Sequence, residues 1–417
     1  MLDRSKNKGE PCFYLRNINV RWFSIDLSDL KEVRIAEQER DKFSVRDGDV
    51  FVCEGGEPGR ASVWRGGDSQ LVYQKALLRF RSNGSVIPEW IAYRLRLDAA
   101  NRVLEDFFSG TTIKHFTRKS FLNYSLPVPP LAEQKRIADK LEVLLGRVDA
   151  CRARLDRLPA LLKRFRQSVL AAATSGKLTE EWRVEEAVGD DWHDTQVQDI
   201  AQQIFDGPFG SHLKTVDYTS SGIRVARLEN IGWMNFHADK EAFISPAKYK
   251  TLTRHTLKSD DVLFSSFISE ETRVAVLPDS WSGNAINKSD CYCIRADQQR
   301  CLPKFLMLRL ACRSTFHLLA ENVHGATRPR INLGQLKSFT FALPSLAEQQ
   351  EIVHRVEALF AFADRIESGL AEARKLIDRL TPATLAKAFR GELAPQDPND
   401  EPAARLLEHL AASSPTP

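Results

Sequence analysis

The hydrophobic residues between positions 131 and 178 recur at alternating steps of three and four. This spacing is the a/d seam of a coiled coil, and it predicts one long helix that begins at Leu131. Gly176 follows the last turn and supplies the left-handed residue that often ends a helix. Pro159 would either kink this helix or divide it in two. The seam residues expected to be buried are Ile137, Leu141, Leu144, Val148, Leu155 and Leu162.

The same pattern returns, without a gap, at residues 346–393, which is 215 positions later. Both copies open on Leu-Ala-Glu-Gln, and Gly391 stands where the first copy has Gly176; Pro382 interrupts the second copy as Pro159 interrupts the first, though not at the matching position. One apolar stripe needs another to cover it, so we expect the two helices, each roughly 66 Å long, to pack as an antiparallel pair. The second seam is Ile352, Val356, Leu359, Ile366, Leu370 and Ile377.

The repeat extends into the sequence that precedes each helix. Short apolar runs between glycine-rich turns predict strands there, and Trp90–Asp98 and Phe305–Ala320 predict helices. The expected fold class is α/β (α+β): two similar mixed α/β domains joined by two long antiparallel coiled-coil helices, with a pseudo-twofold internal repeat. The supporting matches are Gly110-Thr111-Thr112 with Gly325-Ala326-Thr327, Asp49 with Asp261, and Asn17 with Asn230.

These patterns predict six segments and one asymmetry. The second domain opens with residues 197–218, which have no counterpart before Gly9, so we expect the first domain to lack its opening segment. The predicted boundaries are 1–130 for the first domain, 131–178 for the first spacer helix, 179–194 for a linker, 195–345 for the second domain, 346–393 for the second spacer helix and 394–417 for a tail.

Composition adds little to this picture. A hydrophobic content of 43% and a charged content of 27% are typical of a soluble globular protein. The apolar runs are too short for a membrane span, and the seven cysteines are scattered, so we expect a cytoplasmic protein with no membrane partner. The net charge of +4 permits a nucleic-acid partner only if the basic residues are clustered.

Motifs for catalysis are missing from the sequence. There is no phosphate-binding Gly-Lys-Ser/Thr loop, no Gly-x-Gly or Asn-Pro-Pro-aromatic methyl-transfer motif, and no histidine or cysteine pair at metal-ligand spacing. We therefore expect neither an enzyme nor a cofactor or metal site. A nuclease would require a carboxylate cluster that the sequence does not offer.

The duplicated Leu-Ala-Glu-Gln helix resembles the specificity subunit of type I restriction–modification systems. Further resemblance lies in Asp206–His212, Gly110–His115 and Gly176–Arg183, and it covers nearly the whole chain. The resemblance implies a non-catalytic subunit whose two target-recognition domains each read half of a split double-stranded DNA sequence. It also implies that the subunit assembles with two methyltransferase (modification) subunits and, through the complex, with restriction subunits, directing methylation and restriction.

Residues that read DNA are expected to be exposed and basic or amide-bearing. An ordinary solvated surface is the alternative for the basic clusters, and a tight turn is the alternative for an arginine and an asparagine that follow a strand. Arg60 and Arg273, matched at an offset of 213, are expected to be plain surface residues. The DNA-binding candidates are Lys114, His115, Arg118, Lys119, His212, Lys214, Arg227, Asn230, Arg328 and Arg330.

The main rival function is a coiled-coil scaffold that joins two protein partners without reading DNA. A scaffold predicts globular domains without salt-sensitive affinity for duplex DNA. The seam residues are expected to be buried, but the three-four spacing does not decide whether they pack within the chain or against the helices of a partner.

Overall fold

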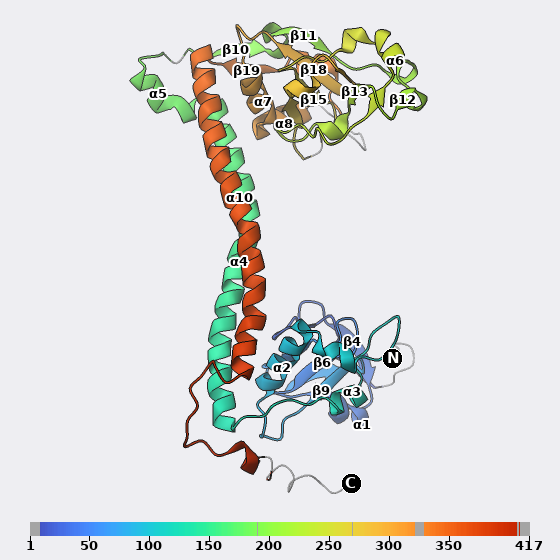
Figure 1. Ribbon diagram of the computed structural model, residues 1–417, viewed down its shortest axis with the longest axis vertical. Coiled ribbons are helices and arrows are strands. Elements are labelled where there is room, and N and C mark those ends of the chain that lie inside the picture. The colour runs from blue at the N-terminus through green and yellow to red at the C-terminus, as the bar shows by residue number, and fades with distance from the viewer. Residues whose placement is uncertain (1–8, 190, 269, 322–328, 407, 409–417) are drawn as a thin grey trace. The chain divides into compact units, whose positions relative to one another are not determined.

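The computed structural model describes residues 9–189, 191–268, 270–321, 329–406 and 408. The chain divides into two compact units, one made of Met1–Asp156 with Ala371–Pro417 and the other of Arg157–Leu370. Each unit contains a globular part of mixed strands and helices together with stretches of both long helices (Figure 1). The predicted mixed α/β class is confirmed. None of the described helices is long and apolar enough to span a membrane.

The two long helices are α4 (Leu131–Thr174) and α10 (Leu346–Phe389), each of 44 residues. Pro159 and Pro382 lie inside them, and neither divides its helix. Within the first unit, Arg152 of α4 pairs with Asp378 of α10 at 3.2 Å.

The direction of α10 relative to α4 follows from a second contact in each unit. In the first unit, Arg152 pairs with Asp378, and Asp156 pairs with Arg374 at 3.1 Å. Residue numbers on α10 therefore decrease as residue numbers on α4 increase. In the second unit, Arg166 pairs with Asp364 at 2.6 Å, and Arg355 Nη1 donates to Leu178 O, just after α4, at 3.0 Å, so the direction is the same. The helices are therefore antiparallel in each unit.

No predicted seam residue is exposed, but burial is uneven. In the first unit the seam joins a core with Leu385 and Ala388 of α10, and there Leu145 is more deeply buried than its neighbour Leu144. The buried seam residues are Ile137, Leu141, Val148, Leu162, Ile352, Val356 and Leu370, and the half-buried ones are Leu144, Leu155, Leu359, Ile366 and Ile377.

Within its described residues, the globular part of the first unit contains three sheets and three short α-helices. The four-stranded sheet has the order β4 (Lys31–Ile35), β1 (Glu10–Leu15), β8 (Ser69–Tyr73), β5 (Ser44–Val45). The three-stranded sheet has the order β7 (Ala61–Val63), β6 (Val50–Cys53), β9 (Leu77–Phe80), and β2 (Val20–Arg21) pairs with β3 (Ser24–Ile25). The helices are α1 (Glu37–Arg40), α2 (Pro88–Ala100) and α3 (Arg118–Leu122).

The globular part of the second unit has the same plan with additional strands. One sheet has the order β11 (Ala201–Phe205), β18 (Cys291–Ala296), β15 (Val262–Ser265), β16 (Val274–Val276). A second has the order β12 (Tyr218–Thr219), β14 (Phe243–Ile244), β13 (Ile223–Ala226), β17 (Ala285–Asn287), and β10 (His193–Gln196) pairs with β19 (Thr340–Leu343). The helices are α5 (Glu180–Glu185), α6 (Pro246–Lys250), α7 (Pro303–Ala311), α8 (Arg313–Ala320) and α9 (Leu333–Lys337).

The two units therefore share the same pairing of several strands, as the internal repeat predicts. The parallel pair β1–β8 corresponds to β13–β17, and the antiparallel set β7–β6–β9 corresponds to β16–β15–β18. Among the described residues, the first unit has no strand that corresponds to β10 or β11.

Two details of the sequence interpretation were wrong. Phe305–Ala320 is two helices, because Cys312 has an extended backbone between α7 and α8. Asn17 is not the counterpart of Asn230, because Asn19 makes the equivalent contacts: the side chain of Asn19 accepts from the backbone of Arg16, as Asn230 accepts from Arg227. The true offset is 211, and the shared Leu-x-Asn-Ile letters misled the comparison.

The Leu-Ala-Glu-Gln motif has an observable role. Gln134 and Gln349 are fully buried at the start of α4 and α10. Gln349 Oε1 accepts from the backbone N–H of Leu302 at 2.8 Å, and its amide donates to the carbonyl oxygens of Arg300 and Pro344 at 3.0 and 2.9 Å. Gln134 repeats all three bonds 215 positions earlier, with Ile87, Ser85 and Pro129. Each glutamine thus ties its long helix to the start of α7 or α2.

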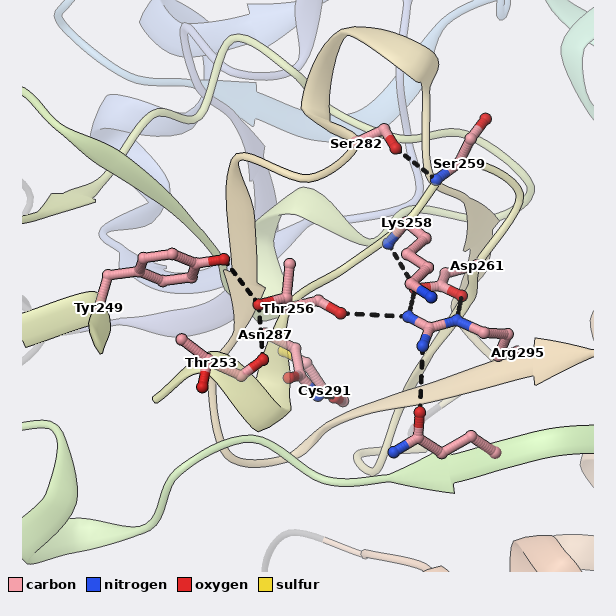
Figure 2. A network of polar contacts seen from close by, with 11 residues as sticks. Tyr249, Thr253, Thr256, Lys258, Ser259, Asp261, Ser282, Asn287, Cys291 and Arg295 are labelled. Carbon is pink, nitrogen blue, oxygen red and sulfur yellow. Dashed lines mark hydrogen bonds and ion pairs between the residues drawn. The ribbon is translucent and has the colours of Figure 1, made fainter. Parts of the chain in front are cut away.

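The core of the second unit also contains a buried ion pair (Figure 2). Asp261 is fully buried, and both of its carboxylate oxygens accept from Arg295, at 2.8 and 2.7 Å. Arg295 also donates to Thr256 O and to Gln203 Oε1. The pair links β18 to the start of β15 and to the neighbouring turn, so its function is structural.

Candidate nucleic-acid interface

The first basic cluster begins on a tight loop between Ser109 and His115. These two residues exchange backbone hydrogen bonds of 2.9 Å in each direction, which closes the loop. Gly110 has a φ of 90°, and a Cβ there would lie 2.3 Å from the carbonyl oxygen of Ile113, so the loop requires glycine. Lys114 and His115 are exposed on this loop.

Helix α3 continues the cluster. The hydroxyl of Thr117 accepts from the backbone N–H of Ser120 at 3.2 Å and caps the helix. Phe116 is fully buried and anchors the chain between the loop and the helix. Arg118 and Lys119 are exposed in the first turn of α3, so all four predicted basic residues of this cluster remain at the surface.

A glycine-rich turn lies against this basic loop. The backbone N–H of Phe116 donates to Glu54 O at 2.7 Å, and a Cβ on Gly55 would lie 3.3 Å from His115 Nδ1. Asn17 Nδ2 donates to Gly55 O at 2.9 Å. The basic loop, the glycine turn and the turn after β1 therefore form one continuous surface.

The second unit presents Arg330 at the corresponding place. The side chain is 55% exposed, its guanidinium lies 4.2 Å from the ring centre of Phe267, and it pairs with Asp290 at 3.4 Å. A guanidinium that lies over an aromatic ring gains a favourable cation–π contact while it remains exposed to water. The other predicted arginine of this cluster, Arg328, lies outside the described residues.

Next to Asp290 is the turn that contains Asp206. A Cβ on Gly207 would lie 2.2 Å from the backbone carbon of Lys288, so the turn packs tightly on the segment before Asp290. Burial, with a smaller contribution from Asp290, raises the pKa of Asp206 to about 6. Near neutral pH, a carboxyl with a raised pKa carries on average less negative charge than an ordinary aspartate. Phe209 is 62% exposed on the same turn.

The remaining predicted residues of the second unit fall into two groups. His212 and Lys214 are exposed on the segment that follows the Asp206 turn, where they are free to reach a ligand. Arg227 is half-buried and pairs with Glu229, so it would have to exchange that partner for a phosphate.

Asn230 does not fit its predicted role in DNA contact. It is fully buried, its Oδ1 accepts from Arg227 N at 2.8 Å, and its Nδ2 donates to His237 O and Lys240 O at 2.8 and 2.9 Å. With its amide occupied in this way, Asn230 holds the turn after β13 instead of reaching a base. The tight-turn alternative is the one that the structure supports.

The profile of the family described as "type I restriction modification DNA specificity domain" matches residues 15–159 and 243–373. Each matched segment ends inside one of the long helices. The chain belongs to the type I restriction–modification specificity family.

Named relatives agree with this assignment. The chain is 33% identical to the type I restriction enzyme EcoBI specificity subunit of Escherichia coli, over 73% of this chain and 67% of that protein. It is 30% identical to the StySPI specificity subunit of Salmonella potsdam, over 95% and 88%. The fold is similar to that of the HsdS subunit from Thermoanaerobacter tengcongensis, with a TM-score of 0.58 and 19% identity over 94% of this chain and 93% of that chain.

Family membership confirms a DNA-recognition subunit in place of an enzyme, and it implies assembly with DNA and with other restriction–modification subunits. The pair Asp206 and Asp290 does not alter this assignment. Among the residues that the structure describes, no group of three or more histidine, cysteine or acidic side chains could hold a metal ion.

The sequence interpretation of this specificity subunit missed two features. Arg60 and Arg273 are not plain surface residues: Arg60 donates to Asn17 O at 2.8 Å and Arg273 to Leu228 O at 3.2 Å, and each fixes the turn that follows β1 or β13. Ile113 and Phe209 are 66% and 62% exposed at the tips of the two candidate loops. Apolar side chains beside basic ones are able to contact base edges, such as thymine methyl groups. The position of Ile113 and Phe209 close to basic residues in the sequence could have identified them as candidates.

Proposed function

We propose that the two globular parts of this specificity subunit are two target-recognition domains, each reading one half of a bipartite duplex sequence. The predicted domain boundaries, 1–130 and 195–345, are part of this proposal. The observation that carries it is the duplication: the parallel strand pair and the buried glutamine at the start of the long helix occur in each unit.

The proposed reading surface of the first unit is the loop with Lys114 and His115, the start of α3, and the adjoining glycine turn. In the second unit it is the surface around Arg330, the Asp206 turn, and the segment with His212 and Lys214. Exposed cations on both surfaces supply the phosphate contacts that position a duplex. Asn230 is left out because it is buried and fully bonded.

The long helices serve in this proposal as the spacer between half-sites and as the docking surface for two methyltransferase subunits in a cytoplasmic complex, to which restriction subunits are added. A helix of 44 residues is about 66 Å long, or about 19 base pairs of duplex, which limits the separation of the half-sites. The scaffold alternative has no observation in its favour, since the family is one of DNA specificity domains.

A double substitution tests the second reading surface. We expect Arg328→Ala with Arg330→Ala to weaken duplex binding roughly tenfold. The slope of log affinity against log salt concentration should become shallower, by the amount expected for the loss of about one or two phosphate contacts. Titrating labelled duplex at several salt concentrations measures both quantities. The matched control is Arg374→Ala with Lys375→Ala, an ion-paired surface couple on α10. Equal affinity in the two variants would remove the Arg330 surface from the proposal.

A further inference from the structure

The backbone at Arg330 is fixed to the segment that follows β15. Arg330 and Phe267 form an isolated antiparallel bridge. The backbone N–H of Ile331 donates to Ser266 O at 3.0 Å. Ser266 is fully buried, so this attachment reaches the interior of the second unit. The main chain at Arg330 is therefore already ordered before it meets a ligand, which lowers the entropic cost of binding.

The side chain of Arg330 is oriented as well. Its guanidinium lies 4.2 Å from the ring centre of Phe267, and its Nη1 pairs with Asp290 at 3.4 Å. Asp290 is held in turn, because its Oδ1 accepts from Ser266 Oγ at 3.1 Å. Within the described part of the chain, no residue accepts from Nε or Nη2 of Arg330. These two nitrogens form one edge of the planar guanidinium, and their N–H groups are two neighbouring donors.

Two neighbouring donors match either a guanine base or a phosphate. Guanine presents its O6 and N7 acceptors side by side in the major groove, and a cationic side chain that binds both makes the commonest base-specific contact. A phosphate also accepts from both donors of an arginine. Charge distinguishes the two ligands, because Asp290 lies against Arg330 and is close enough to Asp206 to raise the pKa of that carboxyl. These carboxylates repel a phosphate but not the neutral edge of guanine, so the surroundings favour the base.

The first unit replaces all three of these residues together. Backbone hydrogen bonds that recur in both units establish the correspondence: the N–H of Ile331 donates to Ser266 O as that of Phe116 donates to Glu54 O, and the N–H of Ser266 donates to Asp290 O as that of Glu54 donates to Ala76 O. The matched pairs are therefore Arg330 with His115, Phe267 with Gly55, and Asp290 with Ala76. Where the arginine is absent, the ring beneath it and the carboxylate beside it are absent too, as expected of side chains that act as one group.

We propose that Arg330 reads one guanine of the second half-site from the major groove, with Nε and Nη2 donating to its O6 and N7. Phe267 and Asp290 are positioning residues, since they hold the guanidinium in the orientation that presents this edge. The first unit presents the imidazole of His115 at the corresponding place, so its half-site does not require the same guanine. This inference rests on the proposed reading of DNA by the second unit and names one base that it recognises.

Sequence selection with an arginine variant tests this role. The full chain and Arg330→Ala, each co-purified with the methyltransferase partners, would select bound sequences from a random duplex pool. We expect the wild-type consensus to include one guanine at which any other base weakens binding about tenfold. The Arg330→Ala consensus should lose that guanine and keep its other positions, because a base contact acts at one position whereas a phosphate contact acts on all sequences alike. The matched control is His115→Ala, which should leave this guanine in the consensus.

A second variant, Asp290→Asn, tests the positioning role. Asparagine has nearly the same shape and tolerates the left-handed backbone of this residue, whose φ is 71°. The substitution removes the negative charge that orients Nη1 of Arg330. We expect discrimination at the guanine to fall at least threefold, while affinity for a duplex without that guanine stays equal or rises, because a charge that repels phosphates is gone. A purely structural role of Asp290 would lower both affinities together.

The possible results separate this inference from the proposed function. If Arg330→Ala bound every sequence more weakly but kept the guanine in its consensus, Arg330 would be a phosphate contact and the inference alone would be overturned. A wild-type consensus without a guanine that depends on Arg330 would overturn the inference in the same way. If the wild-type complex selected no sequence at all, the proposed reading of DNA would fail together with it.

Discussion

Replacing Asp261 with alanine is expected to lower the free energy of unfolding of the second unit by about 3–5 kcal/mol. The substitution leaves the guanidinium of Arg295, only 16% exposed, without its carboxylate. It also removes the acceptor for the backbone N–H of Lys258, which lies 2.7 Å from Asp261 Oδ2. A buried charge that loses its partner costs more than the pair itself contributes.

The repeat offers a matched control for this substitution. Asp49 is also fully buried and binds Arg81 through two bonds, of 2.6 and 2.7 Å, but the side chain of Arg81 is 35% exposed. Asp49→Ala should therefore cost less, about 1–3 kcal/mol, because water can solvate the arginine that remains. Urea denaturation monitored separately in each unit measures both losses. A larger loss for Asp49→Ala would contradict the argument from burial.

Removing the side chain of Gln349 is the second large effect that we expect, at about 3 kcal/mol. Gln349→Ala leaves the backbone N–H of Leu302 and the carbonyl oxygens of Arg300 and Pro344 without partners in a buried site. These groups join the start of α10 to the start of α7. The amide of Leu302 should consequently exchange its hydrogen faster, a local readout that a general loss of stability would not single out.

The neighbouring Gln350 provides the control, because it is exposed on the same turn of α10. Gln350→Ala should change the free energy of unfolding by less than about 0.5 kcal/mol. If Gln349→Ala behaved like Gln350→Ala, the hydrogen bonds of the motif would not be what holds α10 to α7.

The two long helices could be predicted from the sequence because their periodic apolar spacing repeats without insertions or deletions. The helical seam and the closing glycine recur at one fixed offset, since helices tolerate no insertion without rotating the apolar stripe. The strands of the globular parts were predicted less precisely, and their alignment slipped at Asn17, because loops accept insertions and a four-letter match carries little information. Hydrogen bonding, seen only in the structure, shows that Asn19 is the counterpart of Asn230.

Side-chain roles were harder to infer than positions. The sequence showed that Glu133 and Gln134 recur as Glu348 and Gln349. It did not show that the two glutamines anchor the long helices. Nor did it show that Glu348 binds a tryptophan while Glu133 lines a cavity. Burial decided the role of Asn230 in the same way. Such roles depend on contacts between segments far apart in the chain, which no local pattern encodes. The exposed basic candidates stay predictions.

Selection of bound sequences from a random duplex pool would show whether this one chain carries two target-recognition domains. The chain would be co-purified with its methyltransferase partners, and the bound duplexes sequenced. Two target-recognition domains joined by helices of fixed length should yield a bipartite consensus with a gap of fixed length. A single half-site would contradict the presence of two readers, and absence of any enriched sequence despite partner binding would contradict DNA reading by this chain and favour a scaffold.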